Sequence, residues 1–302
     1  MAITGKKTNR VKLFFKKNAS SYLFLLPFLI LYFALTVFPI AQTVQISLSK
    51  WDMMSPNKPF VGLKNFRDLF FNDPLFWISV KATLVYIFSN VPLKIVIGLL
   101  LALALNKKLP GKAFHRTAIF IPIVINIAAV GLLFQWIFNP RMGALNYYLQ
   151  KIGLGPQEWL IKPTWTMAVV VLVSIWWSVA FNAIVFLAGL QSIPGGLYEA
   201  AKIDGANKRQ TFWHITLPCL RGTTMFVCIT QIIGSFQAFG NIYMLTGGGP
   251  SNATRVLMIH LYETGFYYFR MGPAAAMAII LFIIIMLLTL IVLTLFKKQV
   301  EY

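Results

Sequence analysis

Residues 191–222 read QSIPGGLYEAAKIDGANKRQTFWHITLPCLRG. This stretch, called the polar segment below, separates two long apolar runs at residues 164–190 and 223–245. A chain that only had to leave a membrane and re-enter it would need a few residues here. The length and polarity of the segment instead predict a structured surface between two membrane spans.

The polar segment carries the signals of two short helices joined by a glycine turn. Pro194 suits the first turn of a helix, and residues 197–203 have good helical propensity. Gly205 permits a sharp turn, and Asn207 can cap a second helix. Pro218 is expected to end that second helix, with the residue before it held extended.

The surface offered by these helices combines apolar and acidic side chains: Tyr198, Ala201, Ile203 and Phe212 beside Glu199 and Asp204. A loop that merely lay on lipid would favour basic residues, and more bulk than Ala200 and Ala201 provide. We therefore interpret the polar segment as a docking surface for a soluble partner.

The composition of the whole chain is that of a polytopic membrane protein. Of its 302 residues, 58% are hydrophobic and only 12% are charged, whereas a soluble protein carries roughly 25% charged residues. The net charge of +19 does not indicate nucleic-acid binding, because the basic residues lie in short stretches between apolar runs. Cys219 and Cys228 suggest neither a disulfide framework nor a metal site.

The apolar runs predict six transmembrane helices and an all-α polytopic fold. The helices are expected within residues 18–49, 77–105, 117–140, 164–190, 223–245 and 273–296. Backbone that faces lipid must satisfy its own hydrogen bonds, so all six spans should be helical. The resulting organisation is a basic tail at residues 1–18, a six-helix domain at 19–296 and a short tail at 297–302. In the first span, Pro27 and Pro39 predict a kink or an early helix end.

Charge distribution orients the chain in the membrane. Sixteen Lys and Arg residues fall on the side that holds both termini and the polar segment, and nine fall on the opposite side. The positive-inside rule therefore places both termini and the polar segment in the cytoplasm. The first span has a long apolar stretch without a clear cleavage site, which indicates an uncleaved anchor rather than a signal peptide.

Several polar or aromatic side chains interrupt the apolar spans. Those singled out as candidates for a solute path are Lys94, Asn126, Trp177, Asn182, Gln231, Ser235, Phe239 and Asn241. Gln231 and Ser235 are four residues apart and share a helical face, which Phe239 is expected to continue. Such residues serve either as hydrogen-bonding glue between helices or as contacts for a hydrophilic, uncharged solute. The sequence leaves both interpretations open.

The outer loops give weaker signals. Residues 60–70 fit an interfacial helix or a lip that meets an external partner, and residues 135–148 fit an aromatic belt or a surface that stacks on sugars. The glycines at 247–249 are not followed by the Lys and Ser or Thr of a phosphate-binding loop. Because the chain has no such signature anywhere, ATP-driven work would require another subunit.

These residues resemble one family, the inner-membrane permeases of binding-protein-dependent ABC importers. The family's EAA motif is matched by Glu199, Ala200, Ala201 and Gly205, followed by Ile215, Leu217 and Pro218. Further similar stretches lie at 62–66, 136–140, 143–146, 246–250 and 272–277. The likeness is greatest to the carbohydrate-uptake branch, with its MalF and UgpA types. The chain lacks the large outer insertion of the maltose permease, and it has Pro273 where relatives often have Tyr.

The resemblance implies a bacterial inner-membrane subunit that translocates a sugar or oligosaccharide. It implies a second homologous permease, two ATPase subunits and an extracytoplasmic sugar-binding protein as partners. ATP and Mg²⁺ would bind the ATPase subunits, so this chain itself is expected to have no catalytic site and no cofactor. The implied coupling residues are Glu199, Ala200, Ala201, Asp204 and Gly205, with Phe212, Ile215, Leu217 and Pro218 anchoring the segment to the bundle.

Two other classes of protein compete with this interpretation. An ion-gradient-driven transporter of a neutral polar solute would want acidic residues within its spans, but all eight Asp and Glu residues lie outside them. A membrane-embedded enzyme would want clustered catalytic side chains, whereas His115, His214 and His260 are scattered along the chain.

Overall fold

The computed structural model describes residues 19–107 and 110–296. The predicted tails at 1–18 and 297–302, including Lys297 and Lys298, lie outside the described residues. Within the described part, regular structure consists of helices and two isolated β-bridges. The all-α fold class is therefore confirmed.

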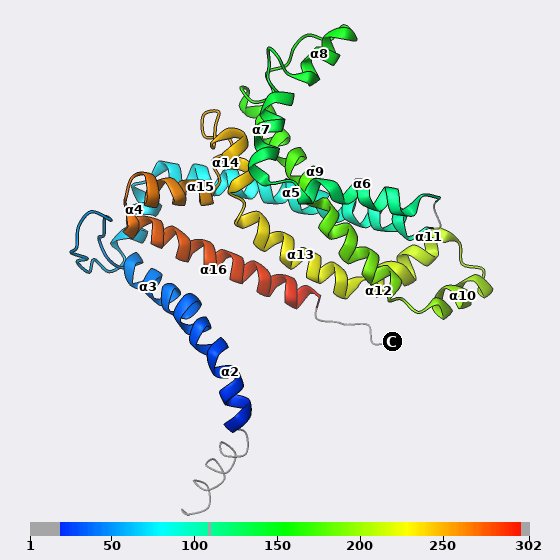
Figure 1. Cartoon of the computed structure of the whole chain (residues 1–302), viewed down its shortest axis with the longest axis horizontal. Coiled ribbons are helices and arrows are strands. Elements are labelled where there is room, and N and C mark those ends of the chain that lie inside the picture. Colours follow the sequence, from blue (N-terminus) through cyan, green and yellow to red (C-terminus); the bar gives the residue numbers. More distant parts are fainter. Residues whose placement is uncertain (1–18, 108–109, 297–302) are drawn as a thin grey trace, which may run out of the picture.

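Two long helices form the centre of the bundle: α5 (Pro74–Asn106) and α9 (Pro163–Gln191). They lie against each other along much of their length; α13 (Arg221–Phe236) packs on both, and α16 (Met271–Leu295) packs on α13 (Figure 1). Asp73 begins α5 by accepting a hydrogen bond from the Leu75 amide at 2.9 Å. The apolar runs at 77–105, 164–190 and 273–296 thus form helices whose ends lie within three residues of the predicted bounds.

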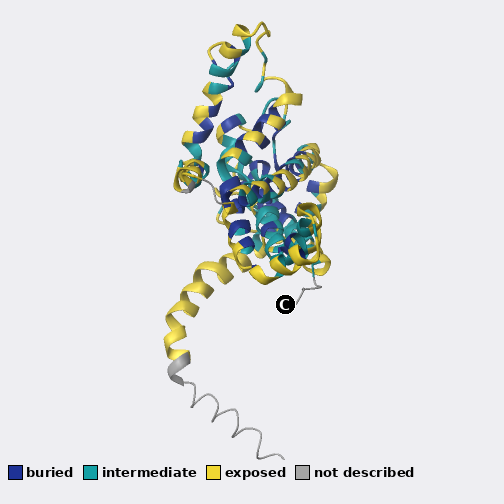
Figure 2. Cartoon of the chain, turned by 90° about the vertical axis from the view of Figure 1, so that its right-hand side faces the viewer, coloured by how far each residue is buried: buried dark blue, intermediate teal, exposed yellow. Residues whose placement is uncertain are grey.

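The first span projects away from this body. It comprises α2 (Ala19–Tyr32), a π-helical turn at Phe33–Val37 and α3 (Phe38–Ser47). Only α3 packs on α16, and α2 is exposed along its length (Figure 2). The helix does not end early at Pro27 or Pro39, as was predicted as one alternative to a kink: residues 22–47 form one continuous helix, with Pro27 inside α2 and the π-turn directly before the first turn of α3, which holds Pro39.

The third span is not one helix, contrary to prediction. It consists of α6 (Lys112–Val124) and α7 (Ile127–Ile137), which meet at 97°. Ile125 is extended at the break, and the backbone groups released there find side-chain partners. The Ala128 amide donates to Asn126 Oδ1 at 2.9 Å, and Trp177 Nε1 donates to the Ile125 carbonyl at 3.0 Å. These two bonds satisfy groups that lipid could not satisfy.

The fifth span is also interrupted. Its helix α13 ends at Phe236, and residues 237–239 separate it from α14 (Gly240–Thr246). Phe239 therefore does not continue the face of Gln231 and Ser235, as was predicted; it precedes α14 and stacks with Tyr243, at 4.9 Å between ring centroids. At its other end α13 bends by 63° from the residue 208–219 helix.

Four of the described helices are long and apolar enough to cross a membrane, and counting each of the two bent pairs as one span gives six. Short helices lie at the bundle ends: α4 (Lys64–Phe71), α8 (Ala144–Lys151) and α15 (Leu257–Tyr262), followed by a π-turn at Glu263–Tyr267. In Figure 1, α4 and α15 lie at the left, α8 lies at the top beyond α7, and the polar segment lies at the right.

Candidate functional site: the polar segment and the interior of the bundle

The polar segment folds into two helical parts joined by a glycine turn, as its sequence predicts. Helix α10 (Gly195–Ile203) ends before Gly205, which has a φ of +78° that favours glycine. The second part begins with α11 (Lys208–Thr211). Asn207 and Gln210 form a capping box, each side chain accepting a hydrogen bond from the other's amide at 2.9 and 2.8 Å.

Pro218 does not end the second helical part, and this corrects the prediction. Leu217 is helical, with φ −68° and ψ −42°, rather than extended. A π-turn over Phe212–Thr216 lets the Leu217 amide bond the Phe212 carbonyl. Pro218 then stands in the first turn of α12 (Leu217–Cys219), where a missing N–H costs little. The chain bends at Leu220, before α13.

Buried contacts hold the polar segment to the bundle. Leu220 is fully buried among Leu105, Phe186 and Leu190, which belong to the C-terminal ends of α5 and α9. Tyr198 packs on this cluster, and its hydroxyl lies 3.2 Å from Thr216 Oγ1, so α10 is tied to the second helical part. The predicted anchors Phe212, Ile215, Leu217 and Pro218 are half-buried.

The solvent-facing side of the polar segment differs in part from the expected patch. Glu199, Ala200, Asp204 and Gly205 are exposed, and Ile203 is 86% exposed. Ala201 is 7% exposed and faces the segment's own interior, so it does not contribute to the outer patch as predicted. Helix α10 and the turn after it therefore present Ile203 beside Glu199 and Asp204, and Trp213 is a second large exposed apolar side chain of the segment.

Inside the bundle, polar side chains from α5, α9, α13 and α14 form what we call the polar ladder: Tyr86, Asn90, Lys94, Ser174, Asn182, Gln231, Ser235 and Asn241. Tyr86, Asn90 and Lys94 are four residues apart in turn, hence on one face of α5. The structure thus brings together five of the eight predicted path residues.

The part of the polar ladder nearer the polar segment centres on Asn182. Its Nδ2 donates to the Lys94 carbonyl at 3.2 Å, and its Oδ1 accepts from Gln231 Nε2 at 2.8 Å. Asn90 Nδ2 lies 3.4 Å from Ser235 Oγ. Lys94 is 7% exposed, and its ammonium makes no hydrogen bond or ion pair within the described part of the chain. These contacts tie α5, α9 and α13 together.

The part of the polar ladder farther from the polar segment joins three side chains, those of Tyr86, Ser174 and Asn241. Asn241 Nδ2 donates to Ser174 Oγ at 2.6 Å and lies 3.4 Å from the Tyr86 hydroxyl, which itself donates to Ser174 Oγ at 3.1 Å. The other three predicted path residues lie elsewhere. Asn126 and Trp177 support the break between α6 and α7, and Phe239 stacks with Tyr243 and Tyr262.

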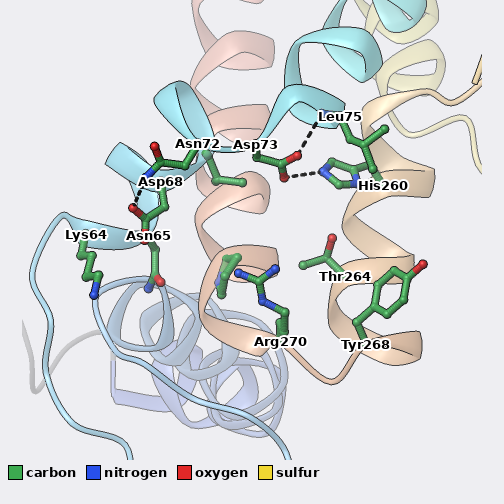
Figure 3. A pocket seen from close by; sticks show the side chains of 12 residues that line it. Lys64, Asn65, Asp68, Asn72, Asp73, Leu75, His260, Thr264, Tyr268 and Arg270 are labelled. Carbon is green, nitrogen blue, oxygen red and sulfur yellow. Dashed lines mark hydrogen bonds and ion pairs between the residues drawn. The ribbon is translucent and has the colours of Figure 1, made fainter.

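A cleft of about 580 Å³ opens at the end of the bundle away from the polar segment, between α4, the start of α5, α15 and the start of α16. Figure 3 shows its polar lining, in which His260 Nε2 meets Asp73 Oδ2 at 3.0 Å. Sequence reasoning flagged residues 60–70 but missed Asp73, His260 and Arg270. Asp73 and His260 are 187 residues apart, so no local pattern could have joined them.

Comparison with known proteins decides the family. Residues 94–302 match the model of the binding-protein-dependent transport system inner membrane component. The chain belongs to this family. It is 40% identical to the probable ABC transporter permease YurN of Bacillus subtilis, over 93% of this chain and 97% of the relative. It is 37% identical to the arabinooligosaccharides transport system permease AraP of the same organism, over 96% and 93% of the two chains.

A solved structure agrees with this assignment. A chain of a bacterial ABC transporter involved in the import of the acidic polysaccharide alginate superposes with a TM-score of 0.84 and 25% identity, covering 97% of this chain and all of that one. The protein is therefore an inner-membrane, multi-pass permease subunit of an ABC importer, and ATP hydrolysis belongs to other subunits. This excludes the ion-gradient transporter and the membrane enzyme. The described residues hold no group of His, Cys, Asp and Glu suited to a metal.

Proposed function

We propose that the permease imports a sugar or oligosaccharide that an extracytoplasmic binding protein delivers. The observation that carries this proposal is the likeness over nearly the whole chain to the arabinooligosaccharide permease and to the alginate importer. Another relative, the sn-glycerol-3-phosphate permease UgpA of Agrobacterium fabrum, is 34% identical over 95% of this chain. A second structure of the alginate importer contains a pentasaccharide-bound periplasmic protein, which supports the same delivery route.

Movement of the ATPase subunits would be transmitted to the permease through the polar segment. In this proposal each of two ATPase subunits holds the coupling segment of one permease, and a second homologous permease completes the pair. Exposed Glu199, Ala200, Asp204 and Gly205 would touch the ATPase, with Ala201 shaping α10 from beneath. Half-buried Phe212, Ile215, Leu217 and Pro218 would carry its movement into the bundle. The proposed coupling set is thus split into contact residues and anchor residues by their burial.

The solute path is proposed along the polar ladder and the two helix breaks. It comprises Lys94, Asn126, Trp177, Asn182, Gln231, Ser235, Phe239 and Asn241. Hydrogen bonds among the ladder residues make them interhelical ties in this conformation, so a solute could reach them only if α5, α9 and α13 separate. Asn126 is already exposed at the break between α6 and α7.

The proposed topology places the polar segment and both termini in the cytoplasm. Its support is the excess of Lys and Arg on that side. Residues 19–296 would then form the transmembrane permease domain, with α4, α8 and α15 outside the cell membrane. ATP and Mg²⁺ would act only on the ATPase subunits.

The coupling role of the polar segment is tested by Glu199→Ala in the assembled importer. Glu199 is exposed on α10, and its side chain makes no hydrogen bond or ion pair with any described residue, so its loss should leave the chain inserted and folded. ATPase association should weaken by about tenfold, equal to about 1.4 kcal/mol, and sugar uptake should be lost. Co-purification of the ATPase and uptake of radiolabelled oligosaccharide measure the two effects.

Gln191→Ala is the matched control, because Gln191 is exposed at the end of α9 but outside α10. Normal ATPase association and uptake in Glu199→Ala would refute the coupling role. Uptake competition with a panel of neutral, acidic and phosphorylated saccharides identifies the substrate class, and failure of every saccharide to compete would refute sugar import.

A further inference from the structure

The outer cleft carries cations that the fold does not use. Lys64 and Arg270 line the cavity of about 580 Å³, and they also line an adjoining hollow of about 200 Å³. Both side chains are exposed, and neither forms a hydrogen bond or ion pair with any described residue. Figure 3 places them on opposite walls, Lys64 at the start of α4 and Arg270 before α16.

The walls that hold these cations are fixed by hydrogen bonds. Asn65 Nδ2 donates to the carbonyls of Ser47 and Ser49 at 2.8 and 2.9 Å, which joins α4 to the end of α3. The Arg270 amide donates to the Thr264 carbonyl at 2.8 Å. On the far wall the Asp73 carboxylate accepts a hydrogen bond from the Leu75 amide through one oxygen and meets His260 Nε2 through the other. The cleft is therefore preorganised. Its charged side chains without an ion pair among the described residues are Lys64, Arg270 and Asp68, whose carboxylate accepts a hydrogen bond from Asn72 Nδ2 at 2.9 Å, so two cations face one anion.

We propose that this cleft receives an acidic side chain of the extracytoplasmic binding protein, paired with Arg270 and Lys64. The inference rests on the proposed import function and names the docking point on this chain. A guanidinium and an ammonium without an anionic partner complement a carboxylate, and arginine binds carboxylates with two parallel hydrogen bonds. Tyr268, which is 59% exposed at the rim, adds the kind of side chain that interfaces favour.

Two other occupants fit the cleft less well. A phospholipid phosphate and a protein carboxylate meet the same repulsion from Asp68 and Asp73, which also line the cavity, but a protein surface can in addition place a hydrogen-bond donor against Asp68. The transported sugar belongs to a different place, because the outermost ladder residue Tyr86 lies 13 positions beyond Asp73 on α5, a distance of about 20 Å along the helix. A mixed-charge cleft that is open at the bundle end suits a protein partner.

The test uses the complete importer, with both permeases and ATPases, in nanodiscs. ATPase rate is measured against the concentration of sugar-loaded binding protein. Arg270→Glu and, separately, Lys64→Glu are expected to raise the half-saturating concentration about tenfold or more while leaving the maximal rate and the basal rate unchanged. Arg67→Glu is the matched control: Arg67 is an exposed cation on the same helix α4 but does not line the cleft.

An unchanged half-saturating concentration in Arg270→Glu, or an equal shift in Arg67→Glu, would overturn the docking proposal. Restoration of affinity to Arg270→Glu by a single Asp or Glu→Lys change on the binding protein would identify the paired residue. A basal rate that depends on anionic lipid in the wild type but not in Arg270→Glu would assign the cleft to lipid and contradict the proposal. If sugar-loaded binding protein fails to stimulate the wild-type complex, the import function itself is wrong.

Discussion

Gly98 lies at a close contact between the two central helices. A Cβ at this position of α5 would lie 2.6 Å from the Cβ of Asn182 on α9. Asn182 is the centre of the polar ladder, so any displacement would also lengthen its bonds to the Lys94 carbonyl and to Gln231. Small residues that permit such approaches are a main determinant of helix association within membranes.

We expect Gly98→Ala to lower the free energy of unfolding by about 1–3 kcal/mol, because the added methyl group overpacks the contact. The measurement is the thermal unfolding midpoint of the purified permease in detergent. Gly234→Ala in α13 is the control, since a Cβ there meets no atom within 4 Å and alanine favours a helix. Equal stability of the two variants would show that α5 and α9 are not in the close contact described.

At the scale of elements, the sequence predicts helices well and breaks poorly. Apolar length located α5, α9 and α16, and the pattern of Asn207 and Gly205 located the turn within the polar segment. The bend between α6 and α7 was missed because one of its supports, Trp177, lies 52 residues from the carbonyl it bonds. The same limit hid the cleft, whose walls come from α4, α5, α15 and α16.

Pro218 shows the opposite error, in which a local rule was applied too strongly. Proline disfavours a helical residue before it, but here the π-turn at Phe212–Thr216 leads into α12 with Leu217 helical and Pro218 in the first turn. For the polar ladder, the sequence predicts several of the members, because they are polar residues in apolar runs. It does not predict which members pair, because the pairs depend on helix packing. Gln231 and Asn182, for example, are 49 residues apart.

The break between α6 and α7 yields a prediction at this scale. Asn126 is exposed and caps α7 through its Oδ1, so Asn126→Ala should lower the free energy of unfolding by about 1 kcal/mol. Asn126→Ser keeps a capping oxygen and should retain most of that stability. Thermal unfolding of both variants is the measurement, and identical losses in alanine and serine would mean that capping does not stabilise the bend.

At the scale of the whole molecule, the chain divides into a packed body and a first span that barely touches it. The core clusters draw on α4, α5, α7, α9, α13, α14, α15 and α16, with the polar segment closing one end. Helix α2 contributes nothing to either cluster, and its side chains form an apolar surface that is exposed in Figure 2. Stability of the isolated chain should therefore depend on the body and be insensitive to α2.

A matched pair of phenylalanine substitutions tests this division. Phe24 in α2 is 87% exposed, whereas Phe76 in α5 is 1% exposed and packs edge-on to Phe70 with ring centroids 5.3 Å apart. Phe76→Leu should lower the free energy of unfolding by about 1 kcal/mol or more because it leaves part of a packed site unfilled, whereas Phe24→Leu should change it by less than about 0.5 kcal/mol. Thermal unfolding of the isolated permease in detergent measures both. An equal loss of free energy of unfolding in Phe24→Leu would mean that α2 packs on the body. The first span would then belong to the core that the polar segment closes.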